Sequence, residues 1–260
     1  TKSLALAQEA QQPRDLITPE MVMRASKMLK MGTSIGVDWW EVEFLRAVTH
    51  EVAVLVAKLL NSIELEMAWP TQILTNIIVL MGKPAGGVRP IALMPMLYRL
   101  WTKVRRDEIR QRDICHTGPW DAAIRGQSAL RAAVMGAMFD EVNCLNGKAI
   151  STVLWDMEKF YDNIDILKLS AKAMEVEYPL TVFTLGIQMH MAPRALKAYD
   201  CNAYTKIPSN GIIAGCVQSN YLARVMLFSI MQALWDNATG PAAMHVTNTY
   251  IRTFVDDIRY

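Results

Sequence analysis

The chain has 260 residues, with 27 basic side chains, 25 acidic side chains and four cysteines. At 52% hydrophobic and 20% charged residues, it is richer in core-forming side chains than a disordered or collagen-like polypeptide, and its length excludes a short disulfide scaffold. The formal net charge of +2 is so small that any surface for a polyanion has to be local. We therefore expect a globular chain of one large or two modest domains.

The N-terminal part of the chain is predicted to be helical. Thr18, followed by a proline and a glutamate, is typical of an N-cap, and the helix after it should run to about Met31. Asp38 and Glu41 have the spacing of a capping box, which predicts a long amphipathic helix through Leu60.

The middle of the chain mixes strands and helices. Residues 75–81 and 89–93 are apolar runs joined by a loop rich in glycine and proline, which predicts a β-hairpin. Residues 96–112 and 128–142 are predicted to be helices. The continuous apolar run of residues 149–155 predicts a strand that is buried on both faces.

The C-terminal part repeats this alternation. Helices are predicted around residues 167–176, 180–190 and 217–236, with a mixed segment and a turn between the last two. A last pair of strands is expected at residues 245–254 and 258–260. Because acidic residues follow these strands, the sequence predicts a site at the strand ends of a mixed α+β fold.

The cysteines, membrane patterns and chain ends bear on the compartment. The four cysteines have neither zinc-site spacing nor a readable disulfide pattern, which favours a reducing, intracellular compartment. The longest apolar run, residues 52–60, contains Lys58 and is shorter than the about 20 residues that cross a bilayer. No secretory signal or membrane span is expected, and the location is not fixed further. Since the chain starts without Met and stops after a strand-like run, we expect an excerpt of a longer protein.

Two acidic clusters carry the chemistry, at residues 156–162 and 254–257. If the strands before them are neighbours, the carboxylates of Asp156, Asp256 and Asp257 converge. Hard divalent ions prefer oxygen ligands, and two ions roughly 3.5–4 Å apart activate a hydroxyl and stabilise a leaving phosphate oxygen. The clusters together indicate nucleotidyl transfer, although an isolated Asp-Asp pair is more often a solvated turn.

Several segments, in order along the chain, resemble motifs of the reverse transcriptase family over roughly residues 65–260. These are residues 83–91 (the fingers motif of enzymes from non-LTR retrotransposons and group II introns), 96–103 (the helix after it), 125–128 (a Gly-Arg-Ser element, here with Gln127 where an arginine is common), 156–162 (the first catalytic palm motif), 211–219 (the template-contacting loop) and 254–257 (the aromatic-x-Asp-Asp signature).

The resemblance implies an α+β fold with the fingers and palm of a right-hand polymerase. The palm would be an antiparallel sheet with helices packed on one face. Residues 1–64 would form a helical N-terminal extension, and residues 65–260 the fingers and palm, truncated after the Asp-Asp motif with the thumb absent. The expected partners are an RNA template, a DNA primer, deoxynucleoside triphosphates, and a missing thumb or flanking domains of a longer protein. No membrane partner is expected.

The resemblance also assigns roles to residues. Asp156 and Asp256 would bridge two Mg²⁺ ions, with Mn²⁺ as the alternative, and Asp257 would be a third ligand or would support the site. Lys83 and Arg89 would meet the triphosphate of the incoming nucleotide, because cationic side chains suit phosphate oxygens.

Further roles concern the sugar and the template. Tyr161 holds the position where the family places an aromatic ring beneath the sugar, which argues for deoxynucleotides. Gly211 and Gly215 belong to the template-contacting loop, and Gly215 allows close approach to the nucleotide. Ala214 replaces the usual glutamine there and cannot make its amide contacts. Four cations at helical spacing would follow the template and primer, unless they form an ordinary solvated face: Arg99, Lys103, Arg106 and Arg110.

Three functions remain open from the sequence. The first is template-directed DNA synthesis from an RNA or DNA template by two-metal nucleotidyl transfer, with reduced or no activity of this fragment alone. The second is an RNA-directed RNA polymerase, and the third is an inactive nucleic-acid-binding remnant of a mobile element. Histidines and tryptophans add little, because the histidines have no partner at ligand spacing and tryptophans in helices and buried strands are usually core.

Overall fold

The computed structural model describes residues 14–84, 86–115, 117–122, 124, 128–149, 157–198, 201–204 and 207–239. In this part the helices are α2 (Pro19–Lys27), α3 (Val42–Arg46), α4 (His50–Glu66), α5 (Met96–Val104), α6 (Arg106–Cys115), α7 (Ala129–Leu145), α8 (Ile166–Glu175), α9 (Leu180–His190) and α10 (Ser219–Thr239). The strands are β1 (Asn76–Gly82), β2 (Val88–Leu93), β3 (Arg194–Ala198) and β4 (Cys201–Tyr204), and the 3-10 turns are η1 (Thr71–Ile73) and η2 (Phe160–Asn163).

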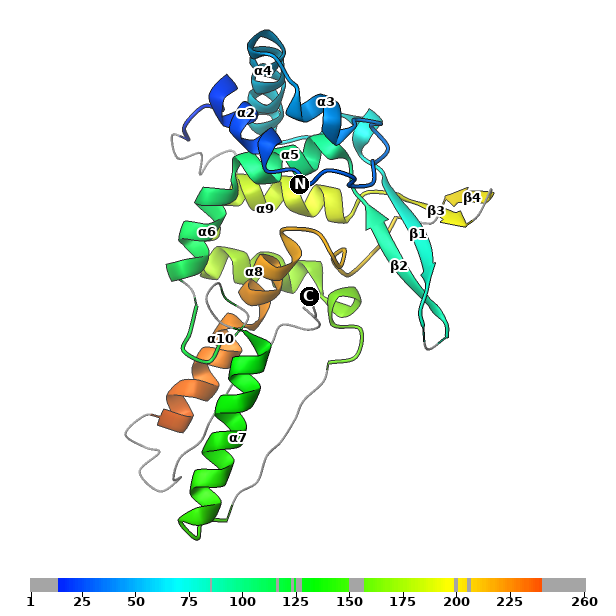
Figure 1. The fold of residues 1–260 in the computed structure, drawn as a ribbon. Coiled ribbons are helices and arrows are strands. Elements are labelled where there is room, and N and C mark those ends of the chain that lie inside the picture. Colours follow the sequence, from blue (N-terminus) through cyan, green and yellow to red (C-terminus); the bar gives the residue numbers. More distant parts are fainter. Residues whose placement is uncertain are drawn as a thin grey trace.

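The content is mixed α and β, as predicted. In Figure 1 the helices α2 and α4 lie near α5 at one end, the β1–β2 hairpin projects to one side, and α7 and α10 extend toward the other end. The strand predicted at residues 149–155 and those at 245–254 and 258–260 fall almost wholly outside the described residues. The antiparallel palm sheet therefore stays a prediction.

The described strands form a mixed sheet in the order β2-β1-β3-β4. β1 and β2 are antiparallel, with Val79 opposite Ile91 and Met81 opposite Arg89, which confirms the predicted hairpin. β3 pairs with β1 in parallel and with β4 antiparallel. No local pattern predicts β3, because its Arg-Ala-Leu-Lys-Ala segment has low β propensity and depends on pairing with β1.

The first helix begins where predicted and ends early. The Thr18 hydroxyl accepts a hydrogen bond from the Met21 amide at 3.3 Å, so Thr18 is the N-cap of α2. The helix ends at Lys27 rather than at Met31. Arg46 Nη1 donates to the carbonyl oxygens of Lys27 and Leu29, both at 2.8 Å, and so satisfies acceptors that the helix end leaves free.

The long helix predicted through Leu60 is wrong in its start and in its end. It is divided into α3 and α4, because Thr49 acts as a second N-cap whose hydroxyl accepts from the Val52 amide. Asp38 does not cap it. The Asp38 carboxylate instead accepts from the Leu97 amide at 2.8 Å, at the start of α5, where the helix dipole favours a negative charge.

The single helix predicted at residues 96–112 is also divided, into α5 and α6, at Arg105. The Arg105 side chain is 5% exposed and donates to both carboxylate oxygens of Glu64, with Nε at 2.7 Å from Oε1. Trp101 Nε1 donates to the same Glu64 oxygen at 2.7 Å. This buried pair joins α4 to α5, so the two sides of the predicted boundary at residues 64 and 65 share one interior, and the boundary itself stays a prediction.

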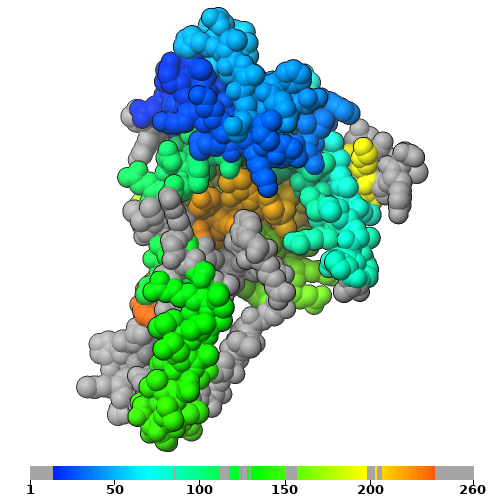
Figure 2. All heavy atoms as spheres, in the orientation of Figure 1, coloured from blue at the N-terminus to red at the C-terminus, as the bar shows by residue number. Residues whose placement is uncertain are grey.

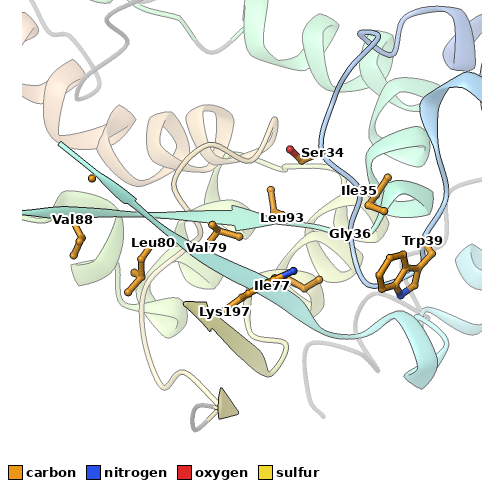
Figure 3. Close-up of a pocket in the computed structure, with 11 residues that line it drawn as sticks. Ser34, Ile35, Gly36, Trp39, Ile77, Val79, Leu80, Val88, Leu93 and Lys197 are labelled. Atoms are coloured by element: carbon orange, nitrogen blue, oxygen red, sulfur yellow. The ribbon is translucent and has the colours of Figure 1, made fainter. Parts of the chain in front are cut away.

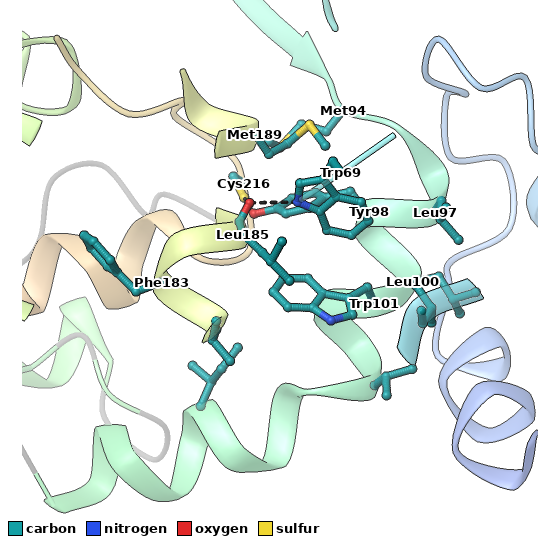
Figure 4. Packing of buried hydrophobic residues seen from close by; sticks show 14 of the residues in the cluster. Trp69, Met94, Leu97, Tyr98, Leu100, Trp101, Phe183, Leu185, Met189 and Cys216 are labelled. Atoms are coloured by element: carbon teal, nitrogen blue, oxygen red, sulfur yellow. Dashed lines mark hydrogen bonds between the residues drawn. The ribbon is translucent and has the colours of Figure 1, made fainter. Parts of the chain in front are cut away.

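The core is centred on three aromatic rings of α5 and its neighbours (Figure 4). Trp69 packs edge-on against Tyr98 and Trp101, with ring centroids 5.6 and 5.4 Å apart. Trp69 Nε1 donates to the Leu185 carbonyl of α9 at 2.9 Å. Trp69 and Trp101 are thus core residues as expected, whereas the Trp39 side chain is 76% exposed.

Candidate active site

The three carboxylates on which the predicted metal site depends are not among the described residues. Asp156, Asp256 and Asp257 lie outside the described ranges, so their convergence stays a prediction. Within the part of the chain that the structure describes, no group of three or more histidine, cysteine, aspartate or glutamate side chains could hold a metal ion.

Two of the predicted motifs meet directly. The η2 turn contains the end of the acidic cluster at residues 156–162, and the loop that begins at Gly211 lies against it. The Gly211 amide donates to the Ile164 carbonyl and the Ile212 amide to the Tyr161 carbonyl, both at 2.8 Å. Gly211 has φ +83°, and a Cβ there would lie 2.6 Å from the Asp162 carbonyl oxygen. Only glycine allows this approach, so the close pairing of the two motifs depends on it.

Tyr161 lies at this junction. Its side chain is half-buried, and its ring packs edge-on against Phe160 with centroids 5.4 Å apart. The Tyr161 hydroxyl donates to Asn220 Oδ1 at 2.9 Å. Asn220 is the second residue of α10, the helix that follows the Gly211–Gln218 loop. One hydrogen bond therefore links Tyr161, the residue predicted to contact the sugar, to the start of this helix.

The loop from Gly211 to Gln218 is held from behind by buried polar groups. The Ile213 amide donates to His190 Nδ1 at 3.0 Å, and the Ser219 hydroxyl donates to the Ile213 carbonyl. The Tyr98 hydroxyl of α5 donates to Gln218 Oε1 at 3.2 Å. Because buried polar groups that are paired resist rearrangement, these bonds fix the inner side of the loop.

The groups behind the loop are kept uncharged by burial. Burial, with a smaller effect of the nearby Arg194 charge, lowers the pKa of His190 to about 3. Burial raises the pKa of the Tyr98 hydroxyl and that of the Cys216 thiol, whose sulfur lies 3.3 Å from the Tyr98 hydroxyl oxygen. His190 therefore supports the loop as a buried, neutral acceptor.

The outer side of the same loop is open. Ala214 and Gly215 are exposed, while Ile212, Ile213 and Cys216 on either side of them are buried. Gly215 has φ +86°, and a Cβ there would meet nothing within 4 Å. The tip of the loop can therefore be approached by a large ligand.

Lys83 and Arg89 lie near the far end of the β1–β2 hairpin and are exposed. The Lys83 amide donates to the Gly87 carbonyl at 3.0 Å and closes the turn. Next to the hairpin lies an elongated, mostly apolar groove of about 740 Å³ (Figure 3). Its lining residues are Ser34, Ile35, Gly36, Trp39, Ile77, Val79, Leu80, Gly82, Val88, Leu93 and Lys197.

The four cations expected on one helix face do not share one helix, because the helix is interrupted at Arg105. Arg99 and Lys103 lie on α5, and Arg106 and Arg110 lie on α6. All four are half-buried. Arg99 Nη1 donates to the Ser34 carbonyl at 2.8 Å, and burial lowers the pKa of Arg99 and of Lys103. The expectation of a single basic helix face is wrong. A role of these residues in binding template and primer stays a prediction.

The comparison with known protein families decides the identity of the chain. A family model described as reverse transcriptase (RNA-dependent DNA polymerase) matches residues 81–260. The chain belongs to the reverse transcriptase family. Reverse transcriptases are RNA-directed DNA polymerases, and so nucleotidyltransferases that generally use divalent metal ions and bind template, primer and deoxynucleoside triphosphates. No curated protein matches the chain.

The region that matches the reverse transcriptase family includes the positions of the predicted carboxylates, the hairpin end and the Gly211–Gln218 loop. The non-LTR or group II intron subtype stays a prediction. Across the described ranges, no helix has the length and apolar character needed to cross a membrane.

Sequence reasoning missed the residues that hold the reverse transcriptase loop in place. The sequence predicts only an ordinary residue at His190 and indicates no role for Tyr98 or Asn220. Their bonds to Ile213, Gln218 and Tyr161 join positions 23, 120 and 59 residues apart. No local pattern signals such pairs.

Proposed function

We propose that this chain carries out template-directed DNA synthesis on an RNA or DNA template by two-metal nucleotidyl transfer. Asp156 and Asp256 hold two Mg²⁺ ions, and Asp257 is the third ligand or supports the other two. Membership of the reverse transcriptase family supports this reading, as does the chemistry of the set, since three carboxylates are the hard oxygen donors that Mg²⁺ or Mn²⁺ prefers.

The chain's own residues orient the reactants. Bound divalent ions lower the pKa of the primer 3′-hydroxyl and stabilise the departing pyrophosphate. Lys83 and Arg89 bind the triphosphate from the end of the hairpin, and their exposure leaves their charges available for it. The Tyr161 ring lies beneath the sugar and excludes a 2′-hydroxyl.

The observation that carries the proposal is the contact between η2 and the Gly211–Gln218 loop. In the family pattern these segments are the end of the first catalytic palm motif and the template-contacting loop, and Asn163, the last residue of η2, lies 48 residues before Gly211 in the chain. The Ile212 amide donates to the Tyr161 carbonyl of η2 at 2.8 Å. Gly211 packs on Asp162 and donates at 2.8 Å to Ile164, the residue directly after η2. Chance matches to the two motifs would not predict that the two segments contact each other in the folded chain.

Template and primer bind on the open side of the same loop. Gly215 allows the close approach, whereas the buried Gly211 shapes the loop from its place against Asp162. Four half-buried cations contribute positive charge toward the phosphate backbone: Arg99, Lys103, Arg106 and Arg110. Ala214, which is exposed at the tip, offers no amide for the contact that glutamine makes in the family. We therefore expect a weaker grip on the template than the family pattern gives.

We assign residues 65–260 to the fingers and palm, and residues 1–64 to a helical extension that packs on them through Glu64 and Arg105. The match to the fingers motif at residues 83–91 favours an enzyme of the non-LTR or group II intron type.

Primer extension by the full-length protein tests the proposal. Asp256→Asn removes a charged metal ligand, so incorporation of deoxynucleotides should fall to background. Asp236→Asn is the matched control, since this exposed carboxylate on α10 accepts from Gln232 and an amide oxygen can replace it. Full activity of Asp256→Asn refutes the metal assignment. A wild-type preference for ribonucleotides would instead identify an RNA-directed RNA polymerase.

A further inference from the structure

We infer that Asn220 is a positioning residue that fixes the ring of Tyr161 and thereby sets how strictly the enzyme excludes ribonucleotides. This inference rests on the proposed function, in which the Tyr161 ring lies beneath the sugar. It adds a residue from outside the catalytic motif, on the first turn of α10.

The ring of Tyr161 is fixed at both ends. At its backbone, the Tyr161 carbonyl accepts from the Ile212 amide at 2.8 Å. At its tip, the hydroxyl donates to Asn220 Oδ1 at 2.9 Å. Phe160 contacts the ring edge-on. A half-buried ring can change rotamer, and the bond to Asn220 restrains that change because it holds the hydroxyl at the tip of the ring.

Asn220 is itself held in a rigid place. Ser219, the residue before it, donates its hydroxyl to the Ile213 carbonyl. One turn further along α10, Arg224 Nε donates to Asp121 Oδ2 at 2.8 Å, and both of these side chains are buried. The start of α10 is therefore anchored on two sides, and Asn220 transmits that rigidity to Tyr161.

The fixed ring explains how the enzyme could discriminate deoxynucleotides from ribonucleotides. A ring excludes a 2′-hydroxyl only if it cannot move away from the extra oxygen, so the energy needed to displace it limits selectivity. A neutral hydrogen bond of this kind corresponds to about a two- to tenfold change in an equilibrium. We expect its loss to lower the preference for deoxynucleotides by a factor of that size.

The test compares the kcat/KM of primer extension with deoxynucleotides and with ribonucleotides. Asn220→Ala removes the acceptor, and Tyr161→Phe removes the donor without changing α10, so a folding defect in one variant leaves the other informative. Each should lower the preference for deoxynucleotides about two- to tenfold, and the double variant should lower it no further. Asn220→Asp keeps an acceptor oxygen and should retain the wild-type preference.

Two further variants complete the set. Tyr161→Ala removes the ring and should lower the preference most. Asn163→Ala is the matched control, since it deletes an amide that donates to the Glu158 carbonyl in the same turn without touching the Tyr161 hydroxyl. It should leave the preference unchanged.

The outcomes distinguish a failure of the proposed role of Asn220 from a failure of the proposed polymerase function. If Tyr161→Ala loses the preference while Asn220→Ala and Tyr161→Phe keep it, the role of Asn220 is overturned and the polymerase assignment stands. A loss of rate that is equal for both sugars in Asn220→Ala also overturns it, because that is the signature of a merely structural residue. If the wild-type protein incorporates neither nucleotide, the proposed function fails and the inference fails with it.

Discussion

Helices α5 and α7 are both rich in large apolar side chains, but their surroundings differ. In α5, Met96, Leu100 and Trp101 are fully buried. In α7, large apolar side chains are exposed along the whole helix, which Figure 2 shows in green extending away from the N-terminal helices. The exposed fractions are 75% for Leu130, 48% for Val134, 46% for Met135, 53% for Met138, 54% for Val142 and 82% for Leu145.

This difference in burial shows which of the two helices has its apolar side chains covered within the described part of the chain. α5 is mostly buried, with the Glu64–Arg105 pair at its C-terminal end and the Gly211–Gln218 loop bonded to its Tyr98. Exposed apolar patches of this extent are uncommon on monomeric proteins. The interior around α5 thus holds the candidate site in place, whereas the apolar face of α7 adds little to the stability of the described part.

Removal of the buried Glu64–Arg105 pair at the C-terminal end of α5 should have the largest effect on stability. Glu64→Ala leaves the Arg105 guanidinium and the Trp101 Nε1–H in the interior without their carboxylate. We expect the free energy of unfolding, measured in urea, to fall by about 3–5 kcal/mol. The control is Glu175→Ala, whose side chain is 52% exposed and pairs with Lys172 on α8, so its expected loss is much smaller than that of Glu64→Ala. Equal losses in the two variants would contradict the comparison.

A pH-dependent effect of intermediate size should come from His190. Its pKa in the folded protein is about 3, against an ordinary value of 6.5, so the unfolded chain binds more protons between these values. The free energy of unfolding should therefore fall as the pH is lowered from 7 to 5, by about 2 kcal/mol from this residue.

The variant His190→Asn isolates that contribution. The asparagine keeps an acceptor for the Ile213 amide but does not titrate. Urea denaturation at pH 5 and pH 7 should show a pH dependence that is smaller by this amount in the variant. The same dependence in both proteins would mean that His190 is accessible to protons in the folded state.

The smallest effect is expected on α7. Met138→Ala removes a side chain that is already half exposed, so the free energy of unfolding should change by less than about 0.5 kcal/mol. Leu100→Ala, a similar truncation at a fully buried position of α5, should cost about 2–5 kcal/mol. A large loss in Met138→Ala would show that this face of α7 is covered in solution and would remove the contrast between the two helices.

Sequence by itself determined the features that depend on neighbours in the chain. Thr18 capped a helix because its hydroxyl reaches an amide three residues away, and the β1–β2 hairpin formed across the glycine-rich turn at Gly86 and Gly87. The helices near 167–176, 180–190 and 217–236 were found within a few residues of their observed bounds for the same reason. The ordered motifs also identified the family.

Only the tertiary structure decided how distant segments use these residues. The Asp38 carboxylate does not cap the helix predicted to follow it. It accepts instead from the Leu97 amide, which is 59 residues away in the chain but 2.8 Å away in the fold. Arg105 ends α5, where its side chain meets the buried Glu64 carboxylate 41 residues earlier, and Asn220 reaches Tyr161 across 59 residues. Such pairings depend on the packing of whole elements, which no local preference encodes.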